Sequence, residues 1–423
     1  MSNHKTPSIR FKGFTDDWEQ RKLEDFGKAT GGTSIESEFS EDGIYKVISI
    51  GSYSENSVYN DQGIRAIKSD KTSNRILNRN DLTMILNDKT TSGNIIGRVL
   101  LIEESGIYIY NQRTERIEIN LDEYDPVFLY EMLNAPNIRE KIIKQAQGNT
   151  QIYVNWTAIS LLEYMIPSKE EQVKIGEYLH SISNLITLHQ RKYEKLVNVK
   201  KSMLDKMFPK NDFKVPEIRF KGFTDDWEQR KVSDLLELLT DYDANGSFAD
   251  MARNVNTTDG TGYAWYVRMT DLENPKPLSE LKYVDEASYK FLKKTELHGG
   301  ELLMAKRGNI GKAYIFEPRT PYATVAPNMY LLKLNDKVIP HFLYNYFISS
   351  KGNNQLVSLN ASSTMGALYK DDVKNINVIM PSIEEQQKIG EYFSHLDNLI
   401  TLHQRELEKL QNLKKSLLNS MFI

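Results

Sequence analysis

Residues 167–208 read PSKEEQVKIGEYLHSISNLITLHQRKYEKLVNVKKSMLDKMF, and residues 381–422 read PSIEEQQKIGEYFSHLDNLITLHQRELEKLQNLKKSLLNSMF. The two stretches are identical at 28 of 42 positions without a gap. Self-similarity of this length and quality is the signature of a duplicated unit. The remaining regions of the chain are therefore interpreted as domains attached to the ends of two related segments.

Each stretch carries the signals of a long helix. Ser168 and Ser382 occupy the expected N-cap positions, and Glu171 and Glu385 follow at capping-box spacing. Apolar residues then recur with the four-then-three spacing of a coiled-coil seam. At about 1.5 Å per residue, each helix would be a rod on the order of 60 Å long. We expect two spacer helices.

Polar residues interrupt the predicted seam at His189, His403, Lys200 and Lys414. Histidines on facing helices can hold a metal or move a proton, but no acidic or Cys ligand shares their face. We favour a role in fixing the register and expect no metal site. The two lysines are expected to extend their ammonium groups to water.

Composition limits the classes of protein that fit. The chain has 423 residues, 40% of them apolar, which suits two to four globular domains. The absence of Cys excludes disulfides, Cys-ligated zinc, iron–sulfur clusters and a thiol nucleophile. No signal core and no membrane-length apolar run is present, so we expect a soluble cytoplasmic protein. The net charge of −3 gives no global support for nucleic-acid binding.

A second repeat precedes each variable region. Residues 7–23 and 216–232, here called the leading segments, share FKGFTDDWEQRK and are identical at 15 of 17 positions. Trp18 and Trp227 within them could form surface platforms, but anchors packed against a helix are favoured. These two residues, with Tyr178 and Tyr392 of the helices, are our candidate partner-binding residues.

The regions between the repeats, residues 24–166 and 233–380, differ from each other and are each the size of one domain. We call them the first and second heads. Short β-branched and aromatic runs separated by Gly, Asn and Asp predict a β-rich mixed α/β fold in each. A helix is expected late in each head, over Val127–Gln147 and Pro340–Leu356. Faint similarity, such as Gly-Asn-Ile at residues 93 and 308, indicates one fold with two different surfaces.

Connectivity then gives the architecture. The second head follows the end of the first helix and precedes the start of the second, so the helices must run antiparallel. The predicted fold class is α+β, with two heads separated by two long antiparallel coiled-coil helices in a pseudo-two-fold repeat. The expected domains are 1–166, 167–208, 209–380 and 381–423, alternating head and spacer helix.

Duplex DNA is the ligand whose geometry suits two unlike heads on a spacer. A protein with approximate two-fold symmetry matches spaced half-sites, and different heads would read different halves of an asymmetric site. Side chains able to read base edges or hold phosphates gather in loops of both heads. The candidates in the first head are Asn87, Lys89, Thr90, Thr91, Ser92, Asn94, Arg98, Gln112, Arg113, Asn149 and Gln151. Those in the second head are Lys306, Arg307, Asn309, Lys312, Asn328, Ser363 and Thr364.

The alternation of PS-x-EEQ-x-KIGEY helices with variable domains resembles the specificity subunit of type I restriction–modification systems. The Gly-Asn-Ile-Gly-Lys segment and the polar turn before the Ile-Pro-Ser helix start are similar too. The resemblance covers nearly the full length. The first head departs from the pattern at Thr90-Thr91-Ser92, which precede its Gly-Asn-Ile.

The resemblance implies that each head is a target recognition domain for half of a bipartite site. The helices would set the spacer and dock two methyltransferase subunits. Those partners would use S-adenosylmethionine to methylate adenine at N6, and separate motor and nuclease subunits would use ATP and Mg. This chain would bind no cofactor itself.

Two alternatives were weighed. The sequence has no phosphate-binding loop, amino-methyltransferase motif, zinc-protease helix or nucleophile elbow, so intrinsic catalysis is not expected. The stronger rival is a scaffolding protein that assembles partners through its coiled coil and does not bind DNA. Salt-sensitive binding to duplex DNA discriminates between the two.

Overall fold

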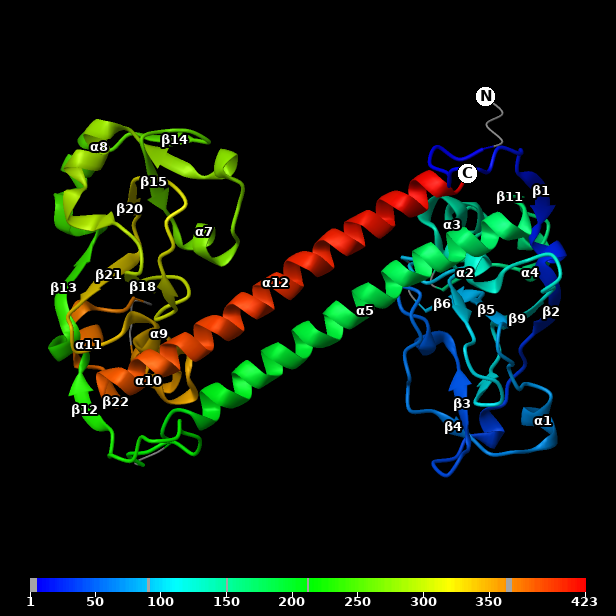
Figure 1. The fold of residues 1–423 in the computed structure, drawn as a ribbon, viewed down its shortest axis with the longest axis horizontal. Helices are drawn as coiled ribbons and strands as arrows, with labels where there is room; N and C mark the ends of the chain where they lie inside the picture. The colour runs from blue at the N-terminus through cyan, green and yellow to red at the C-terminus, as the bar shows by residue number, and fades with distance from the viewer. Residues whose placement is uncertain (1–5, 90–91, 150, 211–212, 363–366) are drawn as a thin grey trace. The chain divides into compact units, whose positions relative to one another are not determined.

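The computed structural model describes residues 6–89, 92–149, 151–210, 213–362 and 367–423. The chain divides into two units (Figure 1). Unit 1 contains residues 1–191 and 404–423, and unit 2 contains residues 192–403. Each unit therefore holds one head, the start of one long helix and the end of the other.

Unit 1 is built on a four-stranded sheet. Its order is β2 (Gly27–Gly31), β9 (Thr114–Ile119), β5 (Leu82–Ile85) and β7 (Val99–Leu101), with antiparallel neighbours. A smaller sheet places β3 (Tyr45–Ile48) between β4 (Arg65–Ala66) and β8 (Tyr108–Tyr110), and β3 and β8 are parallel.

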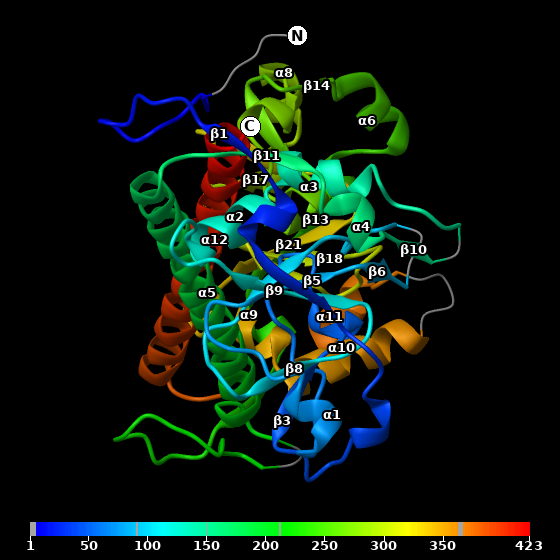
Figure 2. The same ribbon diagram turned by 90° about the vertical axis from the view of Figure 1, so that its right-hand side faces the viewer.

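Shorter elements complete unit 1. The ribbon of β6 (Asn87–Asp88) and β10 (Ile152–Tyr153) lies at one edge (Figure 2). The leading segment contributes β1 (Glu19–Lys22), which pairs with β11 (Glu163–Ile166) at the end of the head. The short helices of the unit are α1 (Asp70–Ser73), α2 (Pro126–Asn134), α3 (Pro136–Ile143) and α4 (Trp156–Ile159).

Unit 2 repeats this plan. Its four-stranded sheet is β13 (Leu236–Asp241), β21 (Met329–Leu334), β18 (Leu302–Ala305) and β19 (Ala313–Ile315). The order of its second sheet is β14 (Thr257–Asp259), β16 (Lys282–Val284), β15 (Ala264–Val267), β20 (Ala323–Val325) and β17 (Glu296–Leu297). β15 and β20 are parallel, as β3 and β8 are. The same fold therefore occurs twice.

The remaining elements of unit 2 also have counterparts. β12 (Glu228–Lys231) of the leading segment pairs with β22 (Asn377–Met380), as β1 pairs with β11. The helices are α6 (Phe248–Asn254), α7 (Met269–Glu273), α8 (Glu286–Phe291), α9 (Pro340–Ile348), α10 (Ser350–Ser362) and α11 (Lys370–Asn375).

The two long helices are α5 (Lys169–Lys206) and α12 (Ile383–Met421). In unit 1 the first half of α5 packs through Ile175 and Leu179 in one core with Leu417 and Met421 near the end of α12. In unit 2 the pairing is reversed, because the end of α5 packs with the start of α12 in the core that contains Phe208 and Phe393. Within each unit the helices run antiparallel, as predicted.

The predicted caps of these helices are confirmed in part. Ser168 and Ser382 accept hydrogen bonds from the backbone N–H of Glu171 and Glu385, at 3.4 Å in both cases. The carboxylates of the two glutamates do not accept the backbone N–H of the cap serine, however, as a capping box requires. Glu171 instead forms a bidentate ion pair with Arg10 at 2.7 and 2.8 Å, and Glu385 does the same with Arg219. Each leading segment is thereby fastened to the first turn of its helix.

The single late helix predicted in each head is wrong, because two helices with a break between them occupy the predicted span, α2 and α3 in unit 1 and α9 and α10 in unit 2. In unit 1 Pro136 lacks an N–H and pushes Ala135 to an extended ψ of 136°. In unit 2 the break falls at Ser349, whose hydroxyl bonds to the carbonyl of Tyr346 at 2.6 Å. Gly352 is required there, since a Cβ would lie 2.1 Å from the carbonyl oxygen of Tyr346.

Candidate nucleic-acid interface

Both heads contain the same turn, which we call the Gly-Asn turn: residues 93–98 in unit 1 and 308–312 in unit 2. In unit 1 the N–H of Gly97 bonds to the carbonyl of Ile85, and the N–H of Ile85 bonds to the carbonyl of Arg98. In unit 2 the N–H of Gly311 bonds to the carbonyl of Ala305, and the N–H of Ala305 bonds to the carbonyl of Lys312. The backbone scaffold is therefore conserved between the heads, although unit 1 has one residue more in its turn.

Glycines make this turn possible. Gly93 and Gly97 have φ values of +64° and +70°, and Gly308 and Gly311 have +78° and +79°. The second glycine also approaches a head helix closely, because a Cβ on Gly97 would lie 2.7 Å from Ile142 and one on Gly311 would lie 3.0 Å from Leu356. The turns are thus rigid platforms and not loose loops.

A second shared feature lies beside each turn. Arg113 and Asn328 both have positive φ, at +68° and +74°, and both precede the first residues of equivalent strands. Their carbonyls accept the N–H groups of Leu86 and Lys306, respectively. Both residues are exposed, so the sequence candidates Arg113 and Asn328 occupy matching surface positions.

In unit 1 the ribbon of β6 and β10 brings two candidate segments together. Asn87 pairs with Tyr153 across this ribbon, so the segment that begins at Asn87 lies beside the turn containing Asn149 and Gln151. Asn87 also accepts a hydrogen bond from Arg113 at 2.6 Å once its amide is oriented to suit its neighbours. The exposed candidates here are Lys89, Ser92, Asn94, Arg113, Asn149 and Gln151, while Thr90 and Thr91 lie outside the described residues.

Two candidates in unit 1 are partly buried and bind other groups of the unit. Arg98 is half-buried and donates to the hydroxyl of Ser57 at 3.1 Å and to the carbonyl of Asn94 at 3.4 Å. Gln112 donates to Glu36 at 3.2 Å. These contacts support the loops that carry the exposed candidates.

In unit 2 the two lysine candidates are paired with acids. Lys306 contacts Asp241 and Asp243 at 2.9 and 2.7 Å, and Lys312 contacts Glu273 at 2.8 Å. Arg307, Asn309 and Asn328 are exposed. Ser363 and Thr364 lie outside the described residues, but Ala367, which follows them, forms a β-bridge with Arg307. The chain therefore lies beside the turn at Ala367.

The acids that hold the turn asparagines were not predicted from the sequence. Asn94 donates through Nδ2 to Oε1 of Glu55 at 2.8 Å, and Asn309 donates through Nδ2 to Oε1 of Glu273 at 2.6 Å. Lys312 and Tyr314 bond to the same oxygen of Glu273, and these contacts lower the pKa of Glu273 to about 2. No local sequence signal marks either glutamate, because each meets its asparagine across some 36 to 39 residues of chain.

A buried arginine also supports the turn of unit 1. Arg139 on α3 is 8% exposed and donates to the carbonyls of Ile96, Gly93 and Asn94. Burial, together with the nearby Arg98, lowers the pKa of Arg139 to about 10. The side chain stays charged at neutral pH and adds a donor to three carbonyls of the turn.

The four candidate partner-binding residues divide into two groups. Trp18 and Trp227 are each 2% exposed and pack edge-on against Phe128 and Phe342 at 6.3 and 5.8 Å. Both indoles are core anchors, the interpretation favoured from sequence, and offer no surface to a partner. Tyr178 is 40% exposed, and Tyr392 is partly exposed beside Phe220. The tyrosines are the members of this set that reach the surface.

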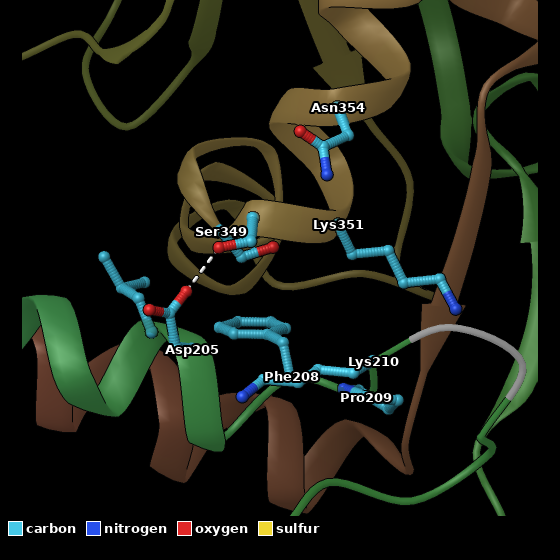
Figure 3. Close-up of a pocket in the computed structure, with 9 residues that line it drawn as sticks. Asp205, Phe208, Pro209, Lys210, Ser349, Lys351 and Asn354 are labelled. Carbon is cyan, nitrogen blue, oxygen red and sulfur yellow. Dashed lines mark hydrogen bonds between the residues drawn. The ribbon is translucent and has the colours of Figure 1, made fainter.

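A hollow of about 360 Å³ lies elsewhere in unit 2, between the end of α5 and the start of α10 (Figure 3). Asp205, Phe208, Ser349 and Lys351 line it, and the hydroxyl of Ser350 donates to Asp205. Since none of the candidate interface residues lines this hollow, we treat it as separate from the site.

Other kinds of site were searched for in the described part of the chain. There, no group of three or more His, Asp or Glu side chains is arranged to hold a metal ion. Among the same residues, no helix combines the length and apolar character that crossing a bilayer requires.

Comparisons with known proteins agree with this architecture. The family model described as type I restriction modification DNA specificity domain matches twice, at residues 15–198 and 224–412. The type I restriction enzyme MjaVIII specificity subunit of Methanocaldococcus jannaschii is 24% identical over 424 residues, covering 96% of this chain and 92% of the relative. The putative MjaX specificity subunit of the same organism is 23% identical over 342 residues, covering 77% and 74%.

One solved structure has the same fold over the whole chain. It is the crystal structure of the type I restriction–modification system S subunit from M. genitalium, with a TM-score of 0.66 and 16% identity. The match covers 99% of both chains.

Proposed function

The chain belongs to the type I restriction–modification DNA specificity family, and we propose that each of its heads reads one half of a bipartite, asymmetric DNA site. The observation that carries this proposal is the pair of Gly-Asn turns. Both heads hold the same backbone scaffold, but they present different side chains around it, such as Arg113 in one and Asn328 in the other. A shared scaffold with different polar groups suits two heads that approach DNA alike and read different bases.

The charges at the candidate interface fit a reader that works within a complex. Lys306 and Lys312 are bound to acids within unit 2, and the whole chain has a net charge of −3. Affinity for DNA depends largely on cations that contact phosphates. We therefore expect the isolated chain to bind DNA weakly, with partner subunits supplying most phosphate contacts.

The repeated surfaces suit a partner present in two copies. Lys12, Asp16 and Asp17 are exposed in unit 1, and Lys221, Asp225 and Asp226 are their exposed counterparts in unit 2. Core packing does not require identity at exposed positions, so a common partner is a physical reason for it. We propose that two methyltransferase subunits dock on the leading segments and on the helix surfaces around Tyr178 and Tyr392.

In this proposal the chain is not the catalyst. The methyltransferase subunits would bind S-adenosylmethionine and methylate adenine, and motor and nuclease subunits would use ATP and Mg. The spacer helices would set the gap between the half-sites. A scaffolding protein that does not bind DNA is the alternative.

The test is a head exchange. The complex of this chain with its methyltransferase subunits is purified, and its preferred sequences are selected from random duplex DNA at one fixed salt concentration. Residues 24–166 are then replaced by the first head of another family member. We expect one half-site to change while the other half-site stays the same.

Matched exchange of residues 233–380 should change only the other half-site. A change in both half-sites after either exchange would contradict modular reading. A parental complex without any sequence preference would favour the scaffolding alternative.

A further inference from the structure

The two heads tie their turn asparagine to a carboxylate in the same way. Glu55 lies seven residues after the end of β3, and Glu273 lies six residues after the end of the equivalent strand β15. Each reaches across to the Gly-Asn turn and accepts a hydrogen bond from Nδ2 of its asparagine, at 2.8 and 2.6 Å. The heads differ in most of their loops, so the recurrence of this contact calls for a reason.

The contact has little value as a support for the turn backbone. The turns are already fixed by the positive φ of their glycines and by the two backbone hydrogen bonds that they share. Asn94 and Asn309 are both exposed, and exposed polar pairs contribute little to stability. The physical effect that remains is on the amide group itself.

A carboxylate determines which way an asparagine amide faces. The amide has an oxygen and an NH2 of nearly equal shape, and rotation about its last torsion is broad when nothing holds it. An ionised carboxylate accepts from the NH2 and repels the oxygen. In unit 2 this carboxylate is kept ionised, because three donors lower the pKa of Glu273 to about 2.

The locked amide keeps one N–H and its carbonyl oxygen for an external ligand. That donor and acceptor, side by side, match N7 and the N6 amino group of adenine in the major groove. An amide free to rotate would offer either group at either place and would discriminate less well. The glutamates thus affect recognition without having to touch the DNA.

We propose that Glu55 and Glu273 are positioning residues that orient Asn94 and Asn309 to read one adenine in each half-site. The inference rests on the proposed function, since it requires the Gly-Asn turns to face DNA. It adds the residues that set the specificity and the base that they select.

The test uses Glu55→Gln and Glu273→Gln in the complex with the methyltransferase subunits. A glutamine side chain has about the same size but is neutral, so its oxygen holds the asparagine NH2 less strongly than an ionised carboxylate does. Binding sequences are selected for each variant and compared with those of the parent. We expect each variant to lose preference at a single A·T position in one half-site, from about tenfold or more to less than about threefold.

Asn94→Ala and Asn309→Ala should lose preference at the same positions as the corresponding glutamine variants. Glu273→Gln combined with Asn309→Ala should be no worse than Asn309→Ala alone at that position, because the glutamate acts through the asparagine. If a glutamine variant fails to assemble, the alanine variant of the same head identifies the position and its base.

Asp243→Asn is the matched control for charge. It removes a carboxylate that is 69% exposed and bonded to Lys306, without touching Asn309. We expect it to change the overall affinity and leave every base preference in place.

The outcomes separate the two proposals. If the parental complex reads a bipartite site but the glutamine variants keep every preference, the positioning role is overturned and the proposed function stands. Loss of preference at several positions, or at a G·C pair, also overturns it. If the parental complex has no sequence preference, the proposed function itself fails.

Discussion

Glu115 is a buried acid without an ion-pair contact within 4 Å in the described structure. It lies on β9 with 6% of its surface exposed, opposite Gly31 of β2. A Cβ on Gly31 would lie 3.3 Å from its Oε2, so the carboxyl group occupies the space beside the glycine. Burial raises the pKa of Glu115 to about 7, and the partly compensating charge is Arg75.

The raised pKa makes the stability of unit 1 depend on pH. Between about pH 4.3, the usual value for an unfolded Glu, and pH 7, the folded chain binds more protons here than the unfolded chain. The free energy of unfolding therefore falls as the pH rises through this window. Glu115→Gln should raise it by about 1 to 3 kcal/mol at pH 8, with the gain shrinking toward pH 4.5.

Thermal unfolding at pH 5, 6, 7 and 8 checks this expectation. Glu118→Gln on the same strand is the control, because the side chain of Glu118 is 58% exposed and its loss should change stability by less than about 0.5 kcal/mol. A gain for Glu115→Gln that is equal at every pH would contradict the titration of this group.

At the scale of elements, the seam lysines hold each long helix to its surroundings. The prediction that Lys200 and Lys414 extend to water is wrong, because both bind acids. In unit 1 Lys414 contacts Glu131 of α2 at 2.8 Å and the hydroxyl of Ser183 on α5 at 2.7 Å. In unit 2 Lys200 contacts Asp397 on α12 at 2.5 Å.

The two arrangements are complementary versions of one site. Ser183 corresponds to Asp397 by the helix repeat, and Glu131 corresponds to Asn345 when the first residue of α2 is aligned with that of α9. In unit 1 the acid is on α2 of the head and a hydroxyl is on the long helix α5. In unit 2 the acid is on the long helix α12 and an amide is on α9 of the head. Each unit supplies one acid for one lysine.

Single changes should upset this balance, and the double change should restore it. Glu131→Asn leaves Lys414 without its acid, and we expect a loss of about 2 to 4 kcal/mol. Ser183→Asp adds a second carboxylate to a largely buried site and should cost about 1 to 2 kcal/mol. The double variant recreates the arrangement of unit 2 and should recover more than half of the summed loss.

Hydrogen exchange of α2 measures these effects better than one melting temperature, since a chain of two units need not unfold in a single step. Exchange of α9 in unit 2 is the internal control and should not change. If the loss of stability in the double variant equalled the sum of the two single losses, an acid at position 183 would not replace Glu131 as the partner of Lys414.

At the scale of the whole molecule, unit 1 brings together two segments that are far apart in the sequence. The N–H of Ile9 bonds to the carbonyl of Ser420 at 3.1 Å, within unit 1. In unit 2 the N–H of Ile218 makes the equivalent bond to Lys206 at 2.9 Å, within a continuous chain. Residues 209–215, seven in number, make that connection between Phe208 and Pro216.

Joining the termini would give unit 1 a connection of the same length. Residue 423 followed by residues 1–6 also makes seven residues, between Phe422 and Pro7. We therefore expect a circular permutant, with Ile423 fused to Met1 and the chain opened within 209–215, to keep the fold and both half-sites. Sequence selection with the assembled complex, and its thermal unfolding, measure this.

A permutant opened inside α9, at Asn345, is the control and should fail to fold, because α9 contributes Phe342 and Tyr346 to the core of unit 2. If the permutant opened within 209–215 also failed to assemble, the two connections would not be equivalent.

The sequence by itself determined the duplication, the two long helices, their antiparallel course and the β-rich heads. These follow from identity between repeats, from helical periodicity and from the order of segments along the chain, all of which are local or one-dimensional signals. It also located the Gly-Asn turns, because the Gly-Asn-Ile pattern recurs in both heads and its glycines can adopt the positive φ that the turns require.

Tertiary structure alone decided which polar groups meet. The capping glutamates bind arginines of the leading segments some 160 residues away, each seam lysine finds a different acid, and each turn asparagine finds its glutamate. It also turned Arg98 inward and split the late helices. A side-chain contact depends on distance and direction in three dimensions, and residue spacing carries no record of either once the chain has folded back on itself.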